Sequence, residues 1–216
     1  MKNRKNNGII IIKNYGRSRD IVKIKNITMP RMKGGNGEMK KAYLIVDMSN
    51  DFVADDGKLT VGKEAQRIVP NIIKTADTYF ENGDMIIFCH DCHEEDDRHF
   101  EMWPPHSVKY TRGMMPYGAL MDWYDARKGG DQVLFLPKSE YDAFYKTPLA
   151  EILQMHHVEH VRIAGVCTDI CVYHTIYGAY RSWFKTEVAR DECATFTPFG
   201  DAFLQNAAIA LKTEIV

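Results

Sequence analysis

From residue 42 to the C-terminus, short hydrophobic runs alternate with longer amphipathic segments. The short runs have the length of buried strands, so we expect strands at 42–46, 85–89, 133–136, 161–164 and 187–189, with an edge strand at 214–216. The longer segments predict helices at 64–81, 146–157, about 171–183 and 200–211. This alternation predicts an α/β fold: a single domain with a mostly parallel, doubly wound sheet and helices on both faces.

Residues 91–131 interrupt the alternation of strands and helices. The segment is irregular and is rich in His, Pro, Gly and Trp. A long insertion of this kind within a compact domain usually carries function. We therefore expect it to contribute to a binding or catalytic site.

The chain has 216 residues, of which 45% are hydrophobic, and this suits one domain with a substantial core. Its net charge of −1 conceals an asymmetry between the two ends. Residues 1–41 carry twelve Lys or Arg and two acidic residues, a net charge of +10, so the rest of the chain carries −11. We expect residues 1–38 to be a disordered basic extension, and residues 39–216 to be the folded domain.

A basic extension could instead bind a nucleic acid or an acidic surface. It contains no nucleic-acid-binding motif and precedes an acidic domain, so we expect no nucleic-acid partner. No segment approaches the roughly 18 apolar residues of a membrane span, so we expect no membrane association. The five cysteines are an odd number and do not form a disulfide pattern, which favours a reducing cytoplasm.

Cys171 lies shortly after the predicted strand 161–164 and opens a predicted helix. Backbone N–H groups in a first helical turn are unpaired and the helix dipole is positive there, so a thiolate is stabilised. Open α/β sheets bind ligands at the carboxyl ends of their strands. The sequence therefore predicts an activated sulfur where substrates bind, the alternative being a buried structural cysteine.

Asp47 and Lys138 share this position in the predicted fold. Asp47 ends the first strand, and Lys138 follows the third strand by two residues. Side chains at the carboxyl ends of neighbouring parallel strands converge in space. A thiol, a carboxylate and an ammonium there suit a nucleophile, its base and an electrostatic partner. Asp47 would take the proton of the Cys171 thiol, and Lys138 would hold Asp47 and stabilise the thiolate.

A second cluster lies in the insertion and consists of Asp91, His93, His99 and His106. Asp91 and His93 are two residues apart directly after a strand, so both can point into one site. Three imidazoles and one carboxylate suit Zn²⁺, Fe²⁺ or Mn²⁺, with positions left for water or substrate. We expect one divalent metal ion here, with zinc favoured, and Glu101 is the alternative to His99 as a ligand.

Four motifs, in this order, resemble those of the nicotinamidase branch of the isochorismatase-like cysteine hydrolases. They are Val-Asp-Met-Ser-Asn-Asp-Phe at 46–52, the Asp-to-His segment at 91–106 with its Trp-Pro-Pro-His end, Lys-x-x-Tyr-x-x-Phe at 138–144, and Gly-Val-Cys-Thr-Asp-Ile-Cys-Val at 165–172. The match runs from about Lys41 to the C-terminus and leaves residues 1–38 unmatched. Ile170 departs from the pattern, because some members have His there.

The resemblance implies an enzyme that hydrolyses nicotinamide to nicotinate and ammonia. Cys171 would attack the amide carbonyl to form a thioester, and water activated by Asp47 would then release the acid. A cis peptide bond is implied between Val166 and Cys167. The N–H groups of Cys167 and Cys171 would then form the oxyanion hole.

The metal would anchor the pyridine nitrogen of nicotinamide, and three aromatic side chains from the matched motifs, Phe52, Trp103 and Tyr141, would flank the ring. The expected partner is therefore a small aromatic amide, and we also expect a homo-oligomer.

Two alternative functions remain open from the residues. One is a related cysteine amidase acting on another small amide or carbamoyl compound. The other is a non-catalytic member of the fold, although such proteins should have lost part of the catalytic trio.

Overall fold

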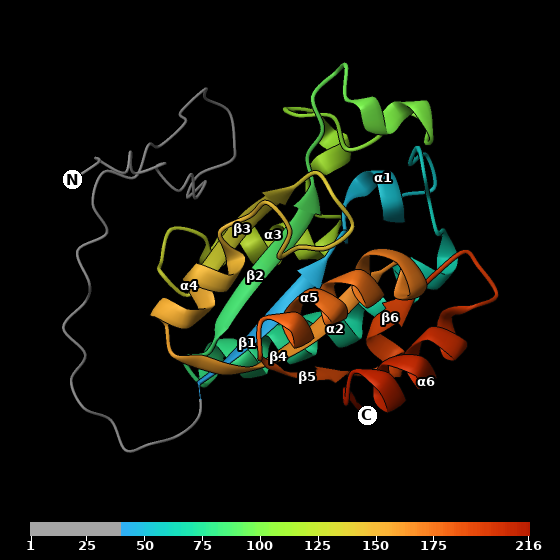
Figure 1. Ribbon diagram of the computed structural model, residues 1–216. Coiled ribbons are helices and arrows are strands. Elements are labelled where there is room, and N and C mark those ends of the chain that lie inside the picture. The colour runs from blue at the N-terminus through green and yellow to red at the C-terminus, as the bar shows by residue number, and fades with distance from the viewer. Residues whose placement is uncertain (1–39) are drawn as a thin grey trace, which may run out of the picture.

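The computed structural model describes residues 40–216. The predicted extension at 1–38 therefore lies outside the described residues. No helix within 40–216 is long and apolar enough to span a membrane. Figure 1 shows the described chain as a central sheet with helices packed on its two faces.

The sheet of this domain contains seven strands, all paired in parallel. They are β1 (Lys40–Val46), β2 (Met85–Asp91), β3 (Val133–Lys138), β4 (Val158–Val166), β5 (Lys185–Val188), β6 (Cys193–Ala194) and β7 (Glu214–Ile215). The strand order is β3-β2-β1-β4-β5-β7, and the short β6 pairs with the end of β4. Strands β2 and β3 follow β1 toward one edge of the sheet, and β5 and β7 follow β4 toward the other edge. The direction in which successive strands are added therefore reverses between the central strands β1 and β4.

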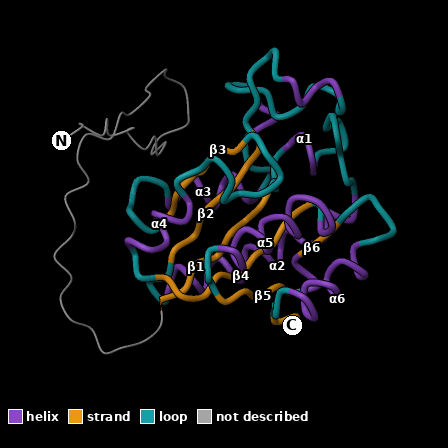
Figure 2. The backbone as a smooth tube through the Cα atoms, viewed as in Figure 1, coloured by secondary structure: helices purple, strands orange, loops and turns teal. Residues whose placement is uncertain are grey.

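Within residues 40–216, six α-helices pack around the sheet, and α2 to α6 cover its two faces (Figures 1 and 2). They are α1 (Asn50–Val53), α2 (Lys63–Glu81), α3 (Ala119–Arg127), α4 (Leu149–Met155), α5 (Tyr173–Arg181) and α6 (Gly200–Ala210). The buried side chains of α1, α2 and α3 join one hydrophobic core, and those of α4, α5 and α6 join the other. The predicted doubly wound α/β fold is confirmed.

The elements differ from the prediction chiefly near the edges of the sheet. Strand β3 continues through Pro137 to Lys138, two residues beyond the predicted end at residue 136. Proline lacks an N–H donor, but β3 lies at the edge of the sheet, where one side of the strand needs no partner. Helix α3 was not predicted within the insertion. It buries Leu120, Trp123 and Tyr124, an i, i+3, i+4 set in only nine residues, which is a weak signal in sequence.

The carboxyl ends of β1 and β4 approach each other closely because of Gly165. This residue pairs with Val46 and adopts φ 123°, a conformation that favours glycine. A Cβ atom at Gly165 would lie 1.9 Å from the carbonyl oxygen of Val46. Asp47, the next residue after β1, has φ 53° and turns the chain away from the sheet. The absence of a side chain at Gly165 thus lets the end of β1 lie beside the segment that carries Cys171.

The insertion is held over this edge of the sheet by residues of α1. The Asn50 side chain donates hydrogen bonds to the carbonyl groups of Arg112 (3.0 Å) and Met115 (2.9 Å). The Asp51 carboxylate accepts a 2.7 Å hydrogen bond from the N–H of Ser107. The motif at 46–52 therefore positions the insertion as well as supplying Asp47.

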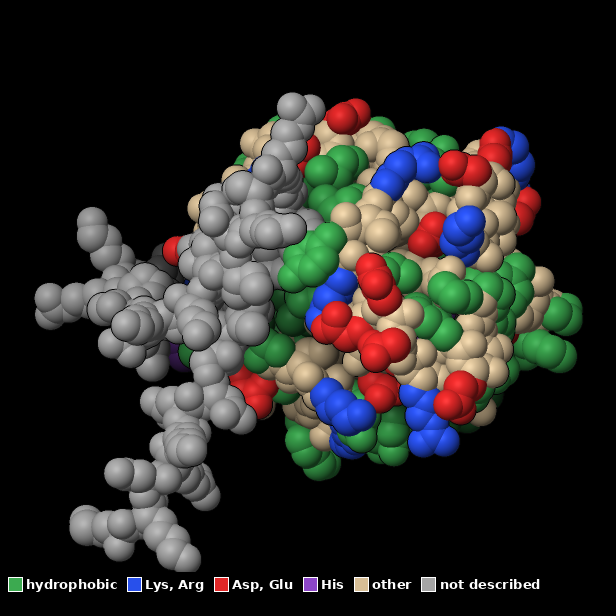
Figure 3. All heavy atoms as spheres, turned by 90° about the horizontal axis from the view of Figure 1, so that it is seen from above, with side chains coloured by type: hydrophobic (Ala, Val, Ile, Leu, Met, Phe, Trp, Pro, Cys, Tyr) green, Lys and Arg blue, Asp and Glu red, His purple; other side chains and the backbone are tan. Residues whose placement is uncertain are grey.

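Seen from above in Figure 3, the visible face carries acidic and basic side chains side by side.

Candidate active site

Lys138 joins the two predicted residue clusters into one site. Its ammonium donates to Oδ2 of Asp47 (2.7 Å) and to Oδ1 of Asp91 (2.5 Å), and it also reaches the carbonyl of Glu140 (3.2 Å). The side chains of Lys138 and Asp47 are fully buried. The Asp91 N–H donates to the other oxygen of Asp47 at 2.8 Å. The sequence placed Lys138 beside Asp47 but gave no signal that it also binds Asp91.

Burial and neighbouring charges shift the pKa values of Asp47 and Asp91 in opposite directions. Burial, followed by the charge of Asp91, raises the pKa of Asp47 to about 6, although Lys138 opposes this shift. Burial would also raise the pKa of Asp91, but Lys138, His106 and His93 hold it well below its ordinary value. Asp91 is therefore the permanent anion of the pair, whereas Asp47 can change its protonation state near neutral pH.

Cys171 lies in a π-helical turn, Thr168–Val172, that leads directly into α5. The turn is closed by hydrogen bonds of 3.1 Å from the N–H groups of Ile170 and Val172 to the carbonyl of Cys167. The peptide bond between Val166 and Cys167 is cis, as the resemblance implies. This geometry brings the Cys171 sulfur and one carboxylate oxygen each of Asp47 and Asp91 within 4.8 Å of one another.

The resting charge of Cys171 differs from the sequence prediction. The start of a helix was expected to stabilise a thiolate, but burial raises the pKa of the thiol well above its ordinary value, and Lys138 offsets this only in part. The Cys171 sulfur lies within 4.8 Å of a carboxylate oxygen of Asp47. The sulfur is therefore neutral at rest, with a proton acceptor already in place.

Three imidazoles gather on the other side of Asp91. The ring nitrogens of His93, His99 and His106 lie within 4.8 Å of one another. The Nε2 atoms of His93 and His106 are each 3.6 Å from Oδ2 of Asp91. Glu101 does not join them, because its exposed side chain faces Arg98 at 3.5 Å. Of the two alternatives for this ligand, the structure therefore places His99 in the cluster.

This donor set fits a divalent metal ion. The Nε2 atom of His93 is buried and has no hydrogen-bond partner among residues 40–216. Nδ1 of His106 donates to the carbonyl of Pro104 at 2.7 Å, which leaves its Nε2 free to accept. Imidazole nitrogens beside one carboxylate match the ligand preferences of zinc and of iron or manganese.

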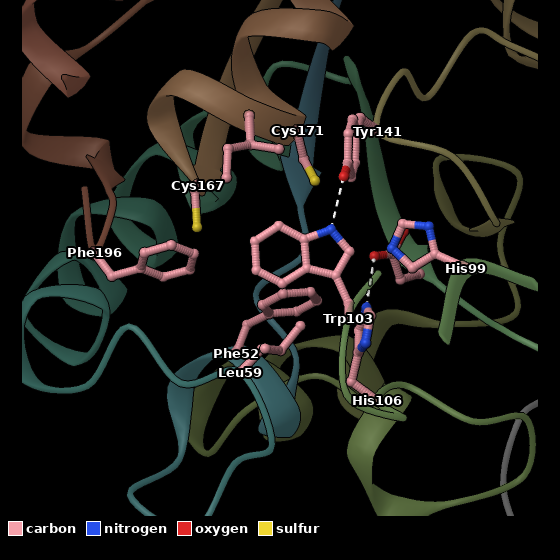
Figure 4. Close-up of a pocket in the computed structure, with 11 residues that line it drawn as sticks. Phe52, Leu59, His99, Trp103, His106, Tyr141, Cys167, Cys171 and Phe196 are labelled. Carbon is pink, nitrogen blue, oxygen red and sulfur yellow. Dashed lines mark hydrogen bonds and ion pairs between the residues drawn. The ribbon is translucent and has the colours of Figure 1, made fainter. Parts of the chain in front are cut away.

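A pocket connects the Cys171 sulfur to the imidazole cluster, and Figure 4 shows its labelled side chains pointing toward one another. The three predicted aromatic residues all line it: Phe52, Trp103 and Tyr141. Trp103 Nε1 donates a 2.9 Å hydrogen bond to the Tyr141 hydroxyl, which fixes the two rings relative to each other. Leu59 and Phe196 also line the pocket and were not predicted.

Ile170, Leu59 and Phe196 complete the wall of this pocket. Ile170, noted as a departure in the nucleophile motif, lies in it. Phe196 lies 6.4 Å from Trp103 between ring centroids and is half exposed, so it flanks the open side. No local pattern in the sequence marks Leu59 or Phe196, because each reaches the pocket from a loop, after α1 and after β6 respectively.

A comparison with known protein families agrees with this geometry. The family model described as the isochorismatase domain matches residues 41–213. The chain belongs to the isochorismatase family. It is 37% identical over 168 residues to a Bacillus subtilis (strain 168) protein named uncharacterized isochorismatase family protein PncA, covering 76% of this chain and 92% of that one. The chain is therefore a hydrolase of the isochorismatase family.

Solved structures of this family show the same fold. The pyrazinamidase/nicotinamidase of Streptococcus mutans UA159 is 37% identical, with a TM-score of 0.79 over 82% of this chain and 100% of that one. The pyrazinamidase of Pyrococcus horikoshii in complex with zinc is 26% identical, with a TM-score of 0.72 over 82% and 98%. An N-carbamoylsarcosine amidase from Thermoplasma acidophilum is 27% identical, with a TM-score of 0.70 over 82% and 95%. These family members share an amidase fold but are named for different substrates.

Proposed function

We propose that this protein hydrolyses nicotinamide to nicotinate and ammonia, with Cys171 as the nucleophile. The observation that carries the proposal is the position of Asp91, which has the Cys171 sulfur within 4.8 Å on one side and two imidazoles at 3.6 Å on the other. One small aromatic amide could therefore meet the thiol and the imidazole cluster together. Nicotinate formed in this way would be available for reuse in pyridine nucleotide synthesis, and we expect this to occur in the cytoplasm.

The first half of the reaction forms a thioester. Asp47 takes the proton of the Cys171 thiol as the sulfur attacks the amide carbonyl carbon. The N–H groups of Cys167 and Cys171 stabilise the oxyanion that develops on the carbonyl oxygen. Protonated Asp47 then gives its proton to the amide nitrogen. The carbon–nitrogen bond breaks, ammonia leaves, and the acyl group stays on the sulfur.

The second half of the reaction releases the acid. A water molecule takes the place of ammonia, and Asp47 removes one of its protons as the oxygen attacks the thioester carbon. The carbon–sulfur bond breaks and Asp47 returns its proton to the sulfur. The acid leaves and gives up its remaining proton to the solvent, so the product is nicotinate. Lys138 stays protonated throughout, because Asp47 and Asp91 raise its pKa well above its ordinary value despite burial. Its charge balances whichever of its neighbours is anionic at each step.

His93, His99 and His106, with Asp91 beside two of them, would hold one divalent ion. Zinc is the simplest choice, because the Pyrococcus horikoshii pyrazinamidase was solved in complex with zinc. Bound there, the ion would supply an open coordination position for the pyridine nitrogen of the substrate. Phe52, Trp103 and Tyr141 would flank the aromatic ring. The ring and the amide group would then be fixed at opposite ends of the pocket, which is a positioning contribution to catalysis.

Benzamide tests this anchoring, because it keeps the ring and the amide but lacks the ring nitrogen. In zinc-loaded protein, we expect kcat/KM for benzamide to be lower than for nicotinamide by about 100-fold or more, the scale of a lost positioning contact. Removing the metal should lower nicotinamide turnover toward the benzamide value and leave benzamide turnover almost unchanged. Ammonia release measured for both substrates, with and without metal, checks these four rates.

Each contrary result has a distinct meaning. Equal rates on the two amides in the zinc-loaded protein would contradict anchoring through the pyridine nitrogen. An equal fall for both substrates on metal removal would show that the ion only supports the fold of the insertion. No activity on nicotinamide would favour the alternative suggested by the N-carbamoylsarcosine amidase relative, a cysteine amidase for another small amide or carbamoyl compound. No turnover of any amide would favour a non-catalytic member of the family.

A further inference from the structure

Asp97 contacts two of the three imidazole residues in the cluster through its two carboxylate oxygens. Oδ2 lies 2.9 Å from Nδ1 of His93. Oδ1 accepts a 2.9 Å hydrogen bond from the backbone N–H of His99. We propose that Asp97 is a positioning residue for the metal centre, which sets the tautomer of His93 and the place of His99. The proposal rests on the metal site described above and not on the identity of the amide substrate.

The contact with His93 selects which ring nitrogen faces the metal. A neutral imidazole carries one N–H, and a carboxylate can only accept hydrogen bonds. In the neutral ring the single proton of His93 therefore lies on Nδ1, where it is donated to Asp97. Its Nε2 then carries a lone pair, and this atom is buried without a hydrogen-bond partner in the described part of the chain. A carboxylate behind a ligating histidine also fixes the ring orientation and increases its basicity.

The contact with His99 places a second ligand. Asp97 precedes the short 3₁₀ helix Arg98–Glu101, and its side chain caps the N–H of His99 within that turn. The carbonyl of His99 in turn accepts hydrogen bonds from the N–H groups of Met102 (3.1 Å) and Trp103 (3.2 Å). The position of the turn that carries His99, and that leads to Trp103 in the pocket, thus depends on this cap.

The contact behind His93 is made by a side chain, that of Asp97, so a substitution can remove it. The corresponding contact of His106 is made by the backbone carbonyl of Pro104, which every side-chain substitution would leave in place. Asparagine at position 97 separates the two roles of the carboxylate. Its amide oxygen can still cap the N–H of His99, but its NH₂ group would face Nδ1 of His93. His93 would then have to carry its proton on Nε2, the atom that should bind the metal.

The test is a zinc competition titration of the full-length, metal-stripped protein against a chromophoric chelator. We expect Asp97→Asn to weaken zinc binding by about 10- to 100-fold, the usual effect of losing such a partner, and Asp97→Ala to weaken it at least as much. Asp96→Asn is the matched control, because it removes the same charge from the exposed neighbouring residue and should leave zinc affinity unchanged. Thermal unfolding of the metal-free proteins should give the same midpoint for wild type and Asp97→Asn.

A second measurement reads the tautomer directly. In metal-free wild-type protein at an alkaline pH, where the imidazole is neutral, long-range ¹H–¹⁵N NMR correlations should show His93 protonated on Nδ1, and in Asp97→Asn they should show it protonated on Nε2. Unchanged zinc affinity in Asp97→Asn, or an unchanged tautomer, would reduce Asp97 to a helix cap. An equal loss in Asp96→Asn would show that only net charge matters. Failure of the wild type itself to bind zinc would overturn the metal site, whereas failure to hydrolyse nicotinamide with normal zinc binding would overturn only the proposed substrate.

Discussion

Cys171→Ala is expected to reduce amide hydrolysis by about 10⁴-fold or more, the scale seen when the nucleophile of a catalytic triad is removed. Without the sulfur, no acyl group can be transferred to the protein, and Asp47 has no thiol to deprotonate. The remaining donors and pocket residues can still bind the substrate, so the residual rate should be above the uncatalysed one. Steady-state ammonia release at saturating nicotinamide measures the loss.

A control must separate lost chemistry from lost structure, because Cys171 is only 4% exposed. Cys193→Ala removes a second, partly buried thiol that lies outside the pocket wall, and its activity should stay within about twofold of wild type, as expected for a position without a catalytic contact. Both variants should show the same cooperative unfolding. Undiminished turnover in Cys171→Ala would refute the assignment of the nucleophile, and a comparable loss in Cys193→Ala would point to a general effect of removing buried sulfur.

The convergence of Asp47, Lys138 and Cys171 could be predicted from sequence because it depends on topology alone. Each follows or ends a strand of a parallel α/β sheet, and carboxyl ends of such strands lie at one edge. The double contact of Lys138 with Asp47 and Asp91 could not be predicted in this way. It depends on side-chain distances of 2.7 and 2.5 Å that no strand pattern specifies.

Other parts of the site depend on tertiary burial or on remote loops. Cys171 lies in the turn before α5, close to the helix start that the sequence predicts, but burial, which no local pattern indicates, is the largest cause of the raised pKa of the thiol. Phe196 reaches the pocket through a loop that is tied to the nucleophile turn, because Thr195 donates a 2.6 Å hydrogen bond to Asp169. Such contacts join segments 26 residues apart and leave no periodic signal in either one.

Lys138→Met is expected to lower the rate of hydrolysis by at least about 100-fold, the scale of general acid–base contributions. Methionine keeps much of the side-chain volume but removes the charge between Asp47 and Asp91. The pKa of Asp47, which Lys138 lowers, would rise further, so the carboxylate that accepts the thiol proton would be less populated at neutral pH. Lys146→Ala, at an exposed lysine paired with Glu140, is the control and should retain near-wild-type activity.

Loss of a buried cation can also unfold a protein, since breaking a buried ion pair costs about 3–5 kcal/mol. The rate should therefore be expressed per folded molecule, with the folded fraction taken from near-UV circular dichroism. A double-mutant cycle then shows how Lys138 acts. If it works through Asp47, the double variant Asp47→Asn/Lys138→Met should be no slower than Asp47→Asn alone, because the base is already lost. Additive losses would instead mean that Lys138 contributes separately, and a near-wild-type rate in folded Lys138→Met would show that its charge is not needed for catalysis.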